Sequence, residues 1–371
     1  MGTVRFLLAL SVALSHMGGP FALFNGTYAV TVFYIISGFL ICMILEGKYK
    51  KRTLLFYQNR ALRIFVPYWI VVSFTWIFLW YKGIGPAAKI SEWAYTFDPL
   101  TWVYIVGTNS LLFGQDWGLF LGYSAQNQLY WISNFRESPV AVYGFQAIPQ
   151  AWSVSLELWF YLLAPFLLRS NSATLFLLLV ACGLMRVFAC KAGLDGDPWS
   201  YRFLPFELSF FLLGALAFRA SQSSLYRRLE ELMPRALPIT IFACAVSLVA
   251  TYRLAPVAKL DWHLTVFHLP LGLFVATAVA LPALLRFSSM FRWDRWLGNL
   301  SYPIYLVHIT VIWTVNAWGI PEYGKLTPLV FTLLAAVLIC LAIERPVDRY
   351  RQRRVTQNPS PSGEVANGAT S

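Results

Sequence analysis

The chain has 371 residues, of which 58% are hydrophobic and 12% are charged, and its formal net charge is +12. A soluble globular domain carries about 25% charged residues, so this composition excludes an ordinary soluble enzyme and favours a protein embedded in a bilayer. No nucleic-acid partner is expected, because the Lys and Arg residues stand in short loops between apolar runs, as in membrane proteins.

Several apolar runs approach the length of about 20 residues that a membrane span needs. They cover residues 4–24, 28–45, 64–81, 152–169, 173–190, 203–219, 238–254, 265–286, 298–318 and 327–344. The sequence therefore predicts an all-α fold, a polytopic membrane helix bundle of about ten transmembrane helices.

A shorter run over 100–114 decides the topology. If it does not cross and the N-terminus is cytoplasmic, 20 of the 29 basic residues fall on the cytoplasmic side; if it crosses, the split is 14 against 15. Because Lys and Arg bias sets orientation, we expect both termini in the cytoplasm. Residues 82–150 then form a long outer region, rich in Trp, Tyr and Gly, that lies partly in the membrane surface or re-enters it. The expected layout is a membrane domain over 1–350 and a basic, then disordered, cytoplasmic tail over 351–371.

Ionisable groups inside spans are expensive and therefore usually functional. Six stand out: Arg5, His16, Glu157, Arg186, Glu207 and His308. Arg5 precedes His16 by about three helical turns, so both project from one helix face. Imidazole titrates near neutrality and can take a proton from a hydroxyl. A neutral histidine satisfied by a backbone carbonyl is the open alternative.

Ser37 stands before a glycine in the second apolar run. A Ser-Gly pair in an apolar helix is typical of close helix packing. This interpretation is favoured over a nucleophilic serine, because no base is beside it in the sequence.

Arg60 and Arg63 stand one turn apart on one helix face, downstream of a basic stretch over 48–52. Two guanidinium groups in this position suit a phosphate-rich ligand. Positive-inside anchoring, or contact with anionic lipid, is the simpler alternative.

Glu157 stands near the start of the run over 152–169. A carboxylate there must pair, accept hydrogen bonds or be protonated. Three roles remain open: orienting His16, orienting an acceptor hydroxyl, or pairing with an arginine. For Glu207, which follows Arg202, a structural pair is the stronger interpretation.

Ser301, Tyr305 and His308 recur at helical spacing in the run over 298–318. They predict either a polar stripe that lines a cavity or a hydrogen-bonded seam between helices. The five cysteines all lie in apolar stretches without metal-ligand spacing, so no metal is expected.

These segments together resemble the acyltransferase 3 family of bacterial integral membrane O-acyltransferases. The resemblance extends over residues 4–350 and rests on seven short motifs in order. They are Arg5 to His16, FYIISGFL, RALR, WSVSLELWFY, RFLPFELSFFLLG, LSYPIYLVH and the ERP at 344–346. Each motif alone is weak, whereas the ordered set is specific.

The resemblance implies about ten helices and the transfer of an acyl group, usually acetyl, from cytoplasmic acyl-CoA. It implies an acceptor hydroxyl on a surface polysaccharide, lipopolysaccharide or lipid-linked sugar, and location in the bacterial inner membrane. His16 matches the catalytic position of the family. Arg5, Arg60 and Arg63 match essential basic positions, with Arg60 and Arg63 at the CoA phosphates.

On this basis we expect His16 and Glu157 to be catalytic. Arg5, Arg60 and Arg63 are expected to bind the acyl-CoA, and Ser37, Tyr305 and His308 the acceptor. The chain departs from many relatives at Leu158 and Trp159, where they carry a more polar residue. Some relatives add a hydrolase-like domain after the last helix. If that domain completes the transfer in those relatives, we expect either that this chain finishes the reaction alone or that a separate glycan-assembly partner does so.

Two other classes of protein compete with the enzyme. A transporter or flippase for a sugar-containing substrate would explain the polar residues within spans, but explains the arginine pair less directly. A structural subunit of a glycan-assembly complex leaves the membrane cost of six ionisable residues unexplained.

Overall fold

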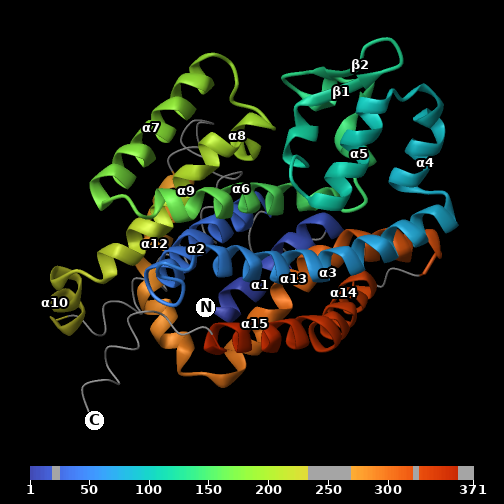
Figure 1. Cartoon of the computed structure of the whole chain (residues 1–371). Coiled ribbons are helices and arrows are strands. Elements are labelled where there is room, and N and C mark those ends of the chain that lie inside the picture. The colour runs from blue at the N-terminus through green and yellow to red at the C-terminus, as the bar shows by residue number, and fades with distance from the viewer. Residues whose placement is uncertain (19–25, 233–268, 321–325, 358–371) are drawn as a thin grey trace, which may run out of the picture. The chain divides into compact units, whose positions relative to one another are not determined.

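The computed structural model describes residues 1–18, 26–232, 269–320 and 326–357, which are mostly helical (Figure 1). Within these residues, six helices are long and apolar enough to cross a membrane. They are Gly26–Glu46, Thr53–Lys82, Ser172–Lys191, Trp199–Ser221, Leu271–Ser289 and Leu326–Gln357. The expectation of a helical, multi-pass membrane protein is therefore confirmed in outline.

The other expected spans differ in length or lie outside the described residues. α1 (Gly2–Met17) and α6 (Trp152–Leu167) have 16 residues each, or about 24 Å of helix against a hydrocarbon core of about 30 Å. α5 (Pro99–Leu111) has 13 residues and α13 (Arg292–Ala317) has 26. The run over 238–254 lies outside the described residues, so the total of ten stays a prediction.

The chain divides into two compact units. The first unit consists of Met1–Met43, Phe166–Leu184 and Glu207–Tyr305, and the second of Ile44–Pro165, Met185–Phe206 and Leu306–Ser371. Helices that lie wholly or partly in the first unit, besides α1 and α13, are α2 (Gly26–Glu46), α7 (Ser172–Lys191), α9 (Leu204–Ser221), α10 (Ser224–Leu232) and α12 (Leu269–Ser289).

In the first unit, α2 and α9 cross at two glycines. A Cβ on Gly38 would lie 1.9 Å from the Phe211 carbonyl oxygen, and one on Gly214 would lie 1.9 Å from the Ile35 carbonyl oxygen. Only residues without a side chain allow this approach, which is a common way for membrane helices to gain packing contacts.

Also in the first unit, Asp294 of α13 caps the start of α1. Its carboxylate accepts hydrogen bonds from the Gly2 amide (2.7 Å), the Thr3 amide (2.8 Å) and the Thr3 hydroxyl (2.7 Å). Burial opposes ionisation of Asp294, but these hydrogen bonds outweigh it and hold its pKa below the usual range. Asp294 thereby satisfies two of the amides that a helix start leaves without partners.

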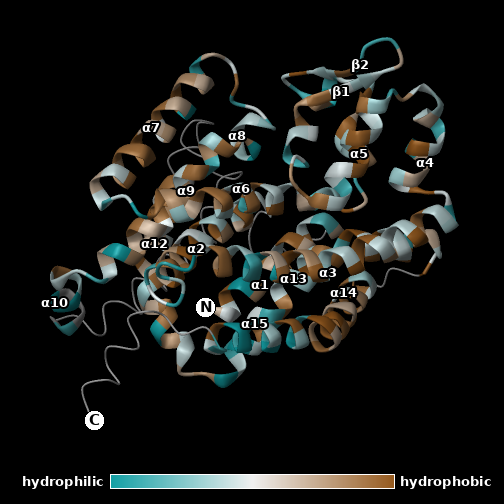
Figure 2. Cartoon of the chain, in the orientation of Figure 1, coloured by the Kyte–Doolittle hydropathy of each residue, from teal (hydrophilic) through white to brown (hydrophobic). Residues whose placement is uncertain are grey.

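The second unit contains α3 (Thr53–Lys82), α6, α14 (Leu326–Ile339), the π-helical turn η7 (Cys340–Glu344) and α15 (Arg345–Gln357). α14 is apolar, whereas α15 is hydrophilic (Figure 2). α15 and η7 both contact α3. α15 extends to Gln357, beyond the expected end of the membrane domain at 350, and residues 358–371 lie outside the described part.

Residues 82–150, expected to form a long outer region rich in Trp, Tyr and Gly, contain a small sheet. Its strands β1 (Leu121–Ser124), β2 (Gln128–Trp131) and β3 (Val140–Ala141) are antiparallel in the order β2-β1-β3. The sheet shares a buried core with α4 (Gly85–Trp93) and α5, made by Ile90, Ile105, Tyr123, Val140, Val142 and Phe145. The sequence analysis did not predict these strands.

Short helical segments complete the second unit. They are η1 (Ala94–Thr96), η2 (Asp116–Leu119), η3 (Phe135–Glu137), η4 (Val142–Phe145), η5 (Pro149–Ala151) and α8 (Trp199–Arg202). Asp98 caps α5 by accepting a hydrogen bond from the Thr101 amide (2.7 Å), and its bonds to Thr101 hold its pKa below the usual value.

Candidate functional site

Arg60 and Arg63 project from the first turns of α3, at the end of the basic segment 46–63. The Tyr49 hydroxyl accepts a hydrogen bond from the Asn59 side chain (3.1 Å), which ties this segment to the helix. The Arg60 guanidinium carbon lies 5.8 Å from the ring centre of Phe56 and 5.5 Å from that of Tyr161. Stacking on aromatic rings holds a guanidinium in place without neutralising it.

Glu157 of α6 lies beside the two arginines. Its carboxylate interacts electrostatically with both guanidinium groups, and it accepts a hydrogen bond from the Tyr161 hydroxyl one turn away. The Tyr161 ring contacts Arg60. The structure therefore brings three of the predicted site residues together, Arg60, Arg63 and Glu157. Of the roles left open for Glu157, partnership with arginines is the one that these contacts match.

The π-helical turn adds a further carboxylate to this cluster. Glu344 gives the largest favourable electrostatic interaction with Arg63, and Asp348 of α15 adds a smaller one. π-helical turns inside helices are frequent at functional sites. The ERP motif at 344–346 is thus joined to the RALR motif in the folded chain.

Arg5 and His16 both lie on α1, in the first unit, as predicted from their spacing. Arg5 is half-buried and His16 is exposed within the described structure. The helix ends at Met17, because Gly18 takes a left-handed conformation (φ 69°) that favours glycine. The catalytic role of His16 and the donor-binding role of Arg5 remain predictions.

Ser37 is buried on α2, next to the Gly38 contact with α9. This placement favours the packing interpretation for the Ser-Gly pair over a nucleophilic serine. Its assignment to the acceptor site stays a prediction.

Ser301, Tyr305 and His308 are all buried on α13. On either side of His308, the helix is hydrogen-bonded within the second unit. The Leu306 carbonyl accepts from the Gln150 amide (2.9 Å), and the Thr310 hydroxyl bonds to that of Thr75 (3.0 Å). These bonds tie the helix to its neighbours at Leu306 and Thr310, and the choice between a seam and a cavity-lining stripe, like a contact with acceptor at Tyr305 or His308, stays a prediction.

Asp116 is a buried carboxyl that sequence reasoning missed. Its Oδ1 accepts a hydrogen bond from the Ser155 hydroxyl of α6 (2.6 Å), which accepts in turn from the Gly114 amide (3.2 Å). Burial raises the pKa of Asp116 to about 6, against the opposing effect of the Ser155 hydrogen bond. In the sequence Asp116 lies between apolar runs, and no residue pattern around it indicates that its side chain is buried.

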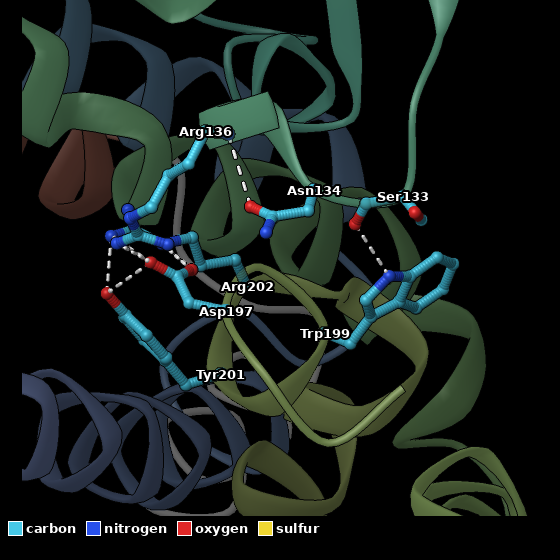
Figure 3. A network of polar contacts seen from close by, with 7 residues as sticks. All are labelled: Ser133, Asn134, Arg136, Asp197, Trp199, Tyr201 and Arg202. Carbon is cyan, nitrogen blue, oxygen red and sulfur yellow. Dashed lines mark hydrogen bonds and ion pairs between the residues drawn. The ribbon is translucent and has the colours of Figure 1, made fainter. Parts of the chain in front are cut away.

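A second arginine-rich network joins residues 133–136 to residues 197–202 (Figure 3). Arg136 bonds to Asp197 through Nη2 (2.7 Å), and Arg202 bonds to it through Nε (2.6 Å). Tyr201 donates to the same carboxylate (3.4 Å), and Trp199 donates to the Ser133 carbonyl (2.9 Å). Arg202, which the sequence suggested as a partner of Glu207, thus pairs with Asp197.

Among the residues that the structure describes, no group of three or more His, Cys, Asp or Glu side chains is placed to hold a metal ion. The groups that the structure brings together in the second unit are guanidinium groups, carboxylates and a phenol.

These motifs and helices define an acyltransferase domain: the family model with this description matches residues 2–345, and the chain belongs to the acyltransferase 3 family. It is 24% identical to the O-acetyltransferase OatA of Staphylococcus aureus strain NCTC 8325 / PS 47 over 387 aligned positions. That alignment covers 98% of this chain and 59% of the relative. OatA of strain MRSA252 is also 24% identical, with 93% of this chain and 56% of the relative covered. The chain thus spans less than two thirds of the length of the relatives it matches. No solved structure matches it.

Proposed function

We propose that the protein is an O-acyltransferase that moves an acyl group, most simply acetyl, from cytoplasmic acyl-CoA to a hydroxyl of a glycan. The acceptor is a cell-surface polysaccharide, a lipopolysaccharide or a lipid-linked sugar. The observation that carries the proposal is the cluster of Arg60, Arg63 and Glu157 in a chain of the acyltransferase 3 family. The S. aureus relatives, named O-acetyltransferases, support acetyl as the group transferred.

Donor binding is assigned to Arg60 and Arg63, with Arg5 as a further basic residue. The phosphates of CoA are multiply charged, and planar guanidinium groups pair with phosphate oxygens in two-point contacts that an ammonium group cannot make. Anchoring to anionic lipid is the simpler use of basic residues. The two arginines are instead held beside aromatic rings and carboxylates, which supports a fixed binding geometry.

His16 is assigned the chemical step. As general base it removes the proton from the acceptor hydroxyl, whose oxygen attacks the thioester carbonyl. The carbon–sulfur bond then breaks, and the CoA thiolate takes up a proton as the ester is released. In the second form of the mechanism, His16 first takes the acyl group itself and passes it to the hydroxyl. Glu157 is proposed to orient the histidine or the acceptor, and Ser37, Tyr305 and His308 to contact the acceptor.

The proposed setting is the bacterial inner membrane, crossed ten times with both termini in the cytoplasm. The asymmetry of Lys and Arg between alternate loops supports this topology. It leaves 82–150 on the outer side, where a glycan acceptor would be available. Other components of a glycan-assembly pathway are possible partners.

Transfer is tested with membranes that contain the protein and acetyl-CoA labelled in the acetyl group. The expected result is label in the glycan fraction, and mass spectrometry of surface glycans should show one acyl mass that is missing when the protein is absent. The transporter interpretation makes the opposite prediction: unmodified substrate crosses proteoliposomes and no label is transferred. Failure to bind CoA and failure to modify any glycan would together exclude the proposed function.

A further inference from the structure

α15 lies along the first turns of α3 within the second unit (Figure 1). The Arg52 guanidinium donates a hydrogen bond to the Val355 carbonyl (3.2 Å), and the Arg354 guanidinium donates to the Gln58 side chain. The segment 46–63 carries six basic residues and one acidic residue, and α15 carries five arginines and one aspartate. Two segments that the sequence presents as separate topology signals therefore form one basic surface.

Arg351 of α15 interacts electrostatically with both arginines of the α3 pair. Its side chain is 12% exposed, and the positive charges of Arg63 and Arg60 act on it. Its ion pair is with Asp348 (3.1 Å), which is itself 44% exposed. Like charges near one another repel, and three carboxylates offset them here: Glu157 and Glu344 act on Arg63, and Asp348 pairs with Arg351.

Two N–H groups of this cluster lack an acceptor. The Nε atoms of Arg60 and Arg351 are buried, and within the described part of the chain neither has a hydrogen-bond partner. Leaving a buried charged donor unpaired costs more than the bond itself would contribute, so such groups call for an explanation. An anionic ligand that supplies oxygen atoms would satisfy both donors and relieve the repulsion.

We propose that Arg351 joins Arg60 and Arg63 in one binding site for a phosphate-bearing ligand, formed by α3 and α15 together. The inference rests on the proposed function, and within it the ligand is the acyl donor, bound through its phosphates. Guanidinium groups from two helices can donate to different oxygens of a phosphate, so Arg351 would add to the contacts that Arg60 and Arg63 make. Asp348 competes with the ligand for Arg351. An anionic lipid headgroup offers the same chemistry and is the other source to be distinguished.

The test is a titration of CoA into the purified full-length chain in neutral detergent, followed by intrinsic fluorescence or calorimetry. Arg351→Gln should weaken CoA binding about tenfold or more, which corresponds to the loss of one charge-assisted hydrogen bond. Arg353→Gln is the matched control, because it removes the same charge from an exposed position on the same helix, and it should change affinity less than twofold. Asp348→Asn should tighten CoA binding severalfold.

Further variants and probes separate the possible results. Arg351→Lys keeps the positive charge but cannot make the two-point contact of a guanidinium group. A loss of CoA affinity in this variant that is smaller than tenfold but larger than that of Arg353→Gln supports the site even if Arg351→Gln unfolds. Pantetheine, which lacks the phosphates, should bind wild type and Arg351→Gln equally. Equal CoA affinity of the Arg351→Gln, Arg353→Gln and wild-type proteins would overturn the inference, while CoA binding by wild type would leave the proposed function standing. Weaker binding of Arg351→Gln to phosphatidylglycerol vesicles alone, with CoA affinity unchanged, would also overturn it.

Discussion

Two arginine clusters in the second unit differ in how their guanidinium groups are neutralised. In the network of Figure 3, Asp197 lies between Arg136 and Arg202 and accepts hydrogen bonds from both. Asp197 and Arg202 are each 14% exposed, and Arg202 also lies 4.4 Å from the ring centre of Trp152. The buried Arg202–Asp197 pair is hydrogen-bonded within the protein, and Arg136, which is 56% exposed, is also solvated, as in a structural connection between two loops.

The cluster of Arg60, Arg63 and Arg351 also has carboxylates beside it, but the hydrogen bonds of its buried guanidinium groups are incomplete within the described residues. Its arginines act on one another as like charges, and two of its buried N–H groups have no acceptor in the described structure. The comparison shows that the abundance of arginine alone does not separate a binding site from a structural network. The unused hydrogen-bonding capacity of the buried Nε atoms distinguishes the α3–α15 cluster, and it is the reason why the ligand site is proposed there.

The largest expected effect comes from His16, which belongs to neither arginine cluster and is proposed to act in the chemical step and not in donor binding. His16→Ala should reduce acyl transfer by up to about ten-thousandfold, since general-base catalysis contributes about 10²–10⁴ in rate and no acyl group could form on the side chain. CoA affinity should stay within twofold of wild type. Transfer from labelled acetyl-CoA and a CoA titration, made on the same folded preparation, check both statements. Retained activity would remove His16 from the mechanism.

The double replacement of Arg60 and Arg63 by alanine should come next. Charge-assisted hydrogen bonds contribute about 1.5–3 kcal/mol each, so CoA affinity should fall roughly a thousandfold. Recognition of the glycan acceptor, measured by binding in the absence of donor, should not change. Unchanged CoA affinity would make these arginines topology anchors and would erase the contrast between the two clusters.

Replacing Asp197 tests the other side of the comparison. Asp197→Ala leaves two guanidinium groups without their carboxylate, and breaking a buried ion pair costs about 3–5 kcal/mol. The variant should therefore lose thermal stability in detergent, with CoA affinity of the folded fraction unchanged. Glu137→Ala, a change at an exposed carboxylate next to Arg136 in the other segment of the network, is the control and should be nearly neutral. A loss of ligand binding without a loss of stability would show that this network, too, is a binding site.

The sequence carried the local features of the fold and of the candidate site. Hydropathy located the long apolar helices, because each membrane span needs its own continuous run of about 20 apolar residues, which can be recognised without knowledge of the other spans. The spacing of Arg60 and Arg63, and that of Arg5 and His16, placed each pair on one helix face for the same local reason.

Features that depend on tertiary contact were not predictable in this way. The meeting of Glu157 with the arginines was one of three possibilities, and the packing of α15 on α3 joins residues about 300 positions apart. Strands of two to four residues are too short for an alternating pattern to be recognised. The burial of Asp116 depends on α6, which follows it by 36 residues.

Asp116 gives the last and smallest prediction, which extends the comparison to a single buried carboxyl. Because burial raises its pKa to about 6 in the folded protein, against about 4 in an unfolded chain, the folded state holds the proton more tightly. The contribution of this carboxyl to the free energy of unfolding is therefore largest below pH 4. It falls as the pH rises from 4 to 6 and does not change further above pH 6. The change is at most about 3 kcal/mol.

Asp116→Asn should remove this pH dependence, since the amide keeps an oxygen that can accept the Ser155 hydrogen bond but carries no charge. The midpoint of thermal unfolding in detergent, measured from pH 4 to pH 7.5, should then fall less with rising pH in the variant than in wild type. Parallel curves for the two proteins would mean that the carboxyl is charged throughout this range. In that case the hydrogen bonds that Asp116 accepts would have to stabilise its charged form enough to offset the effect of burial.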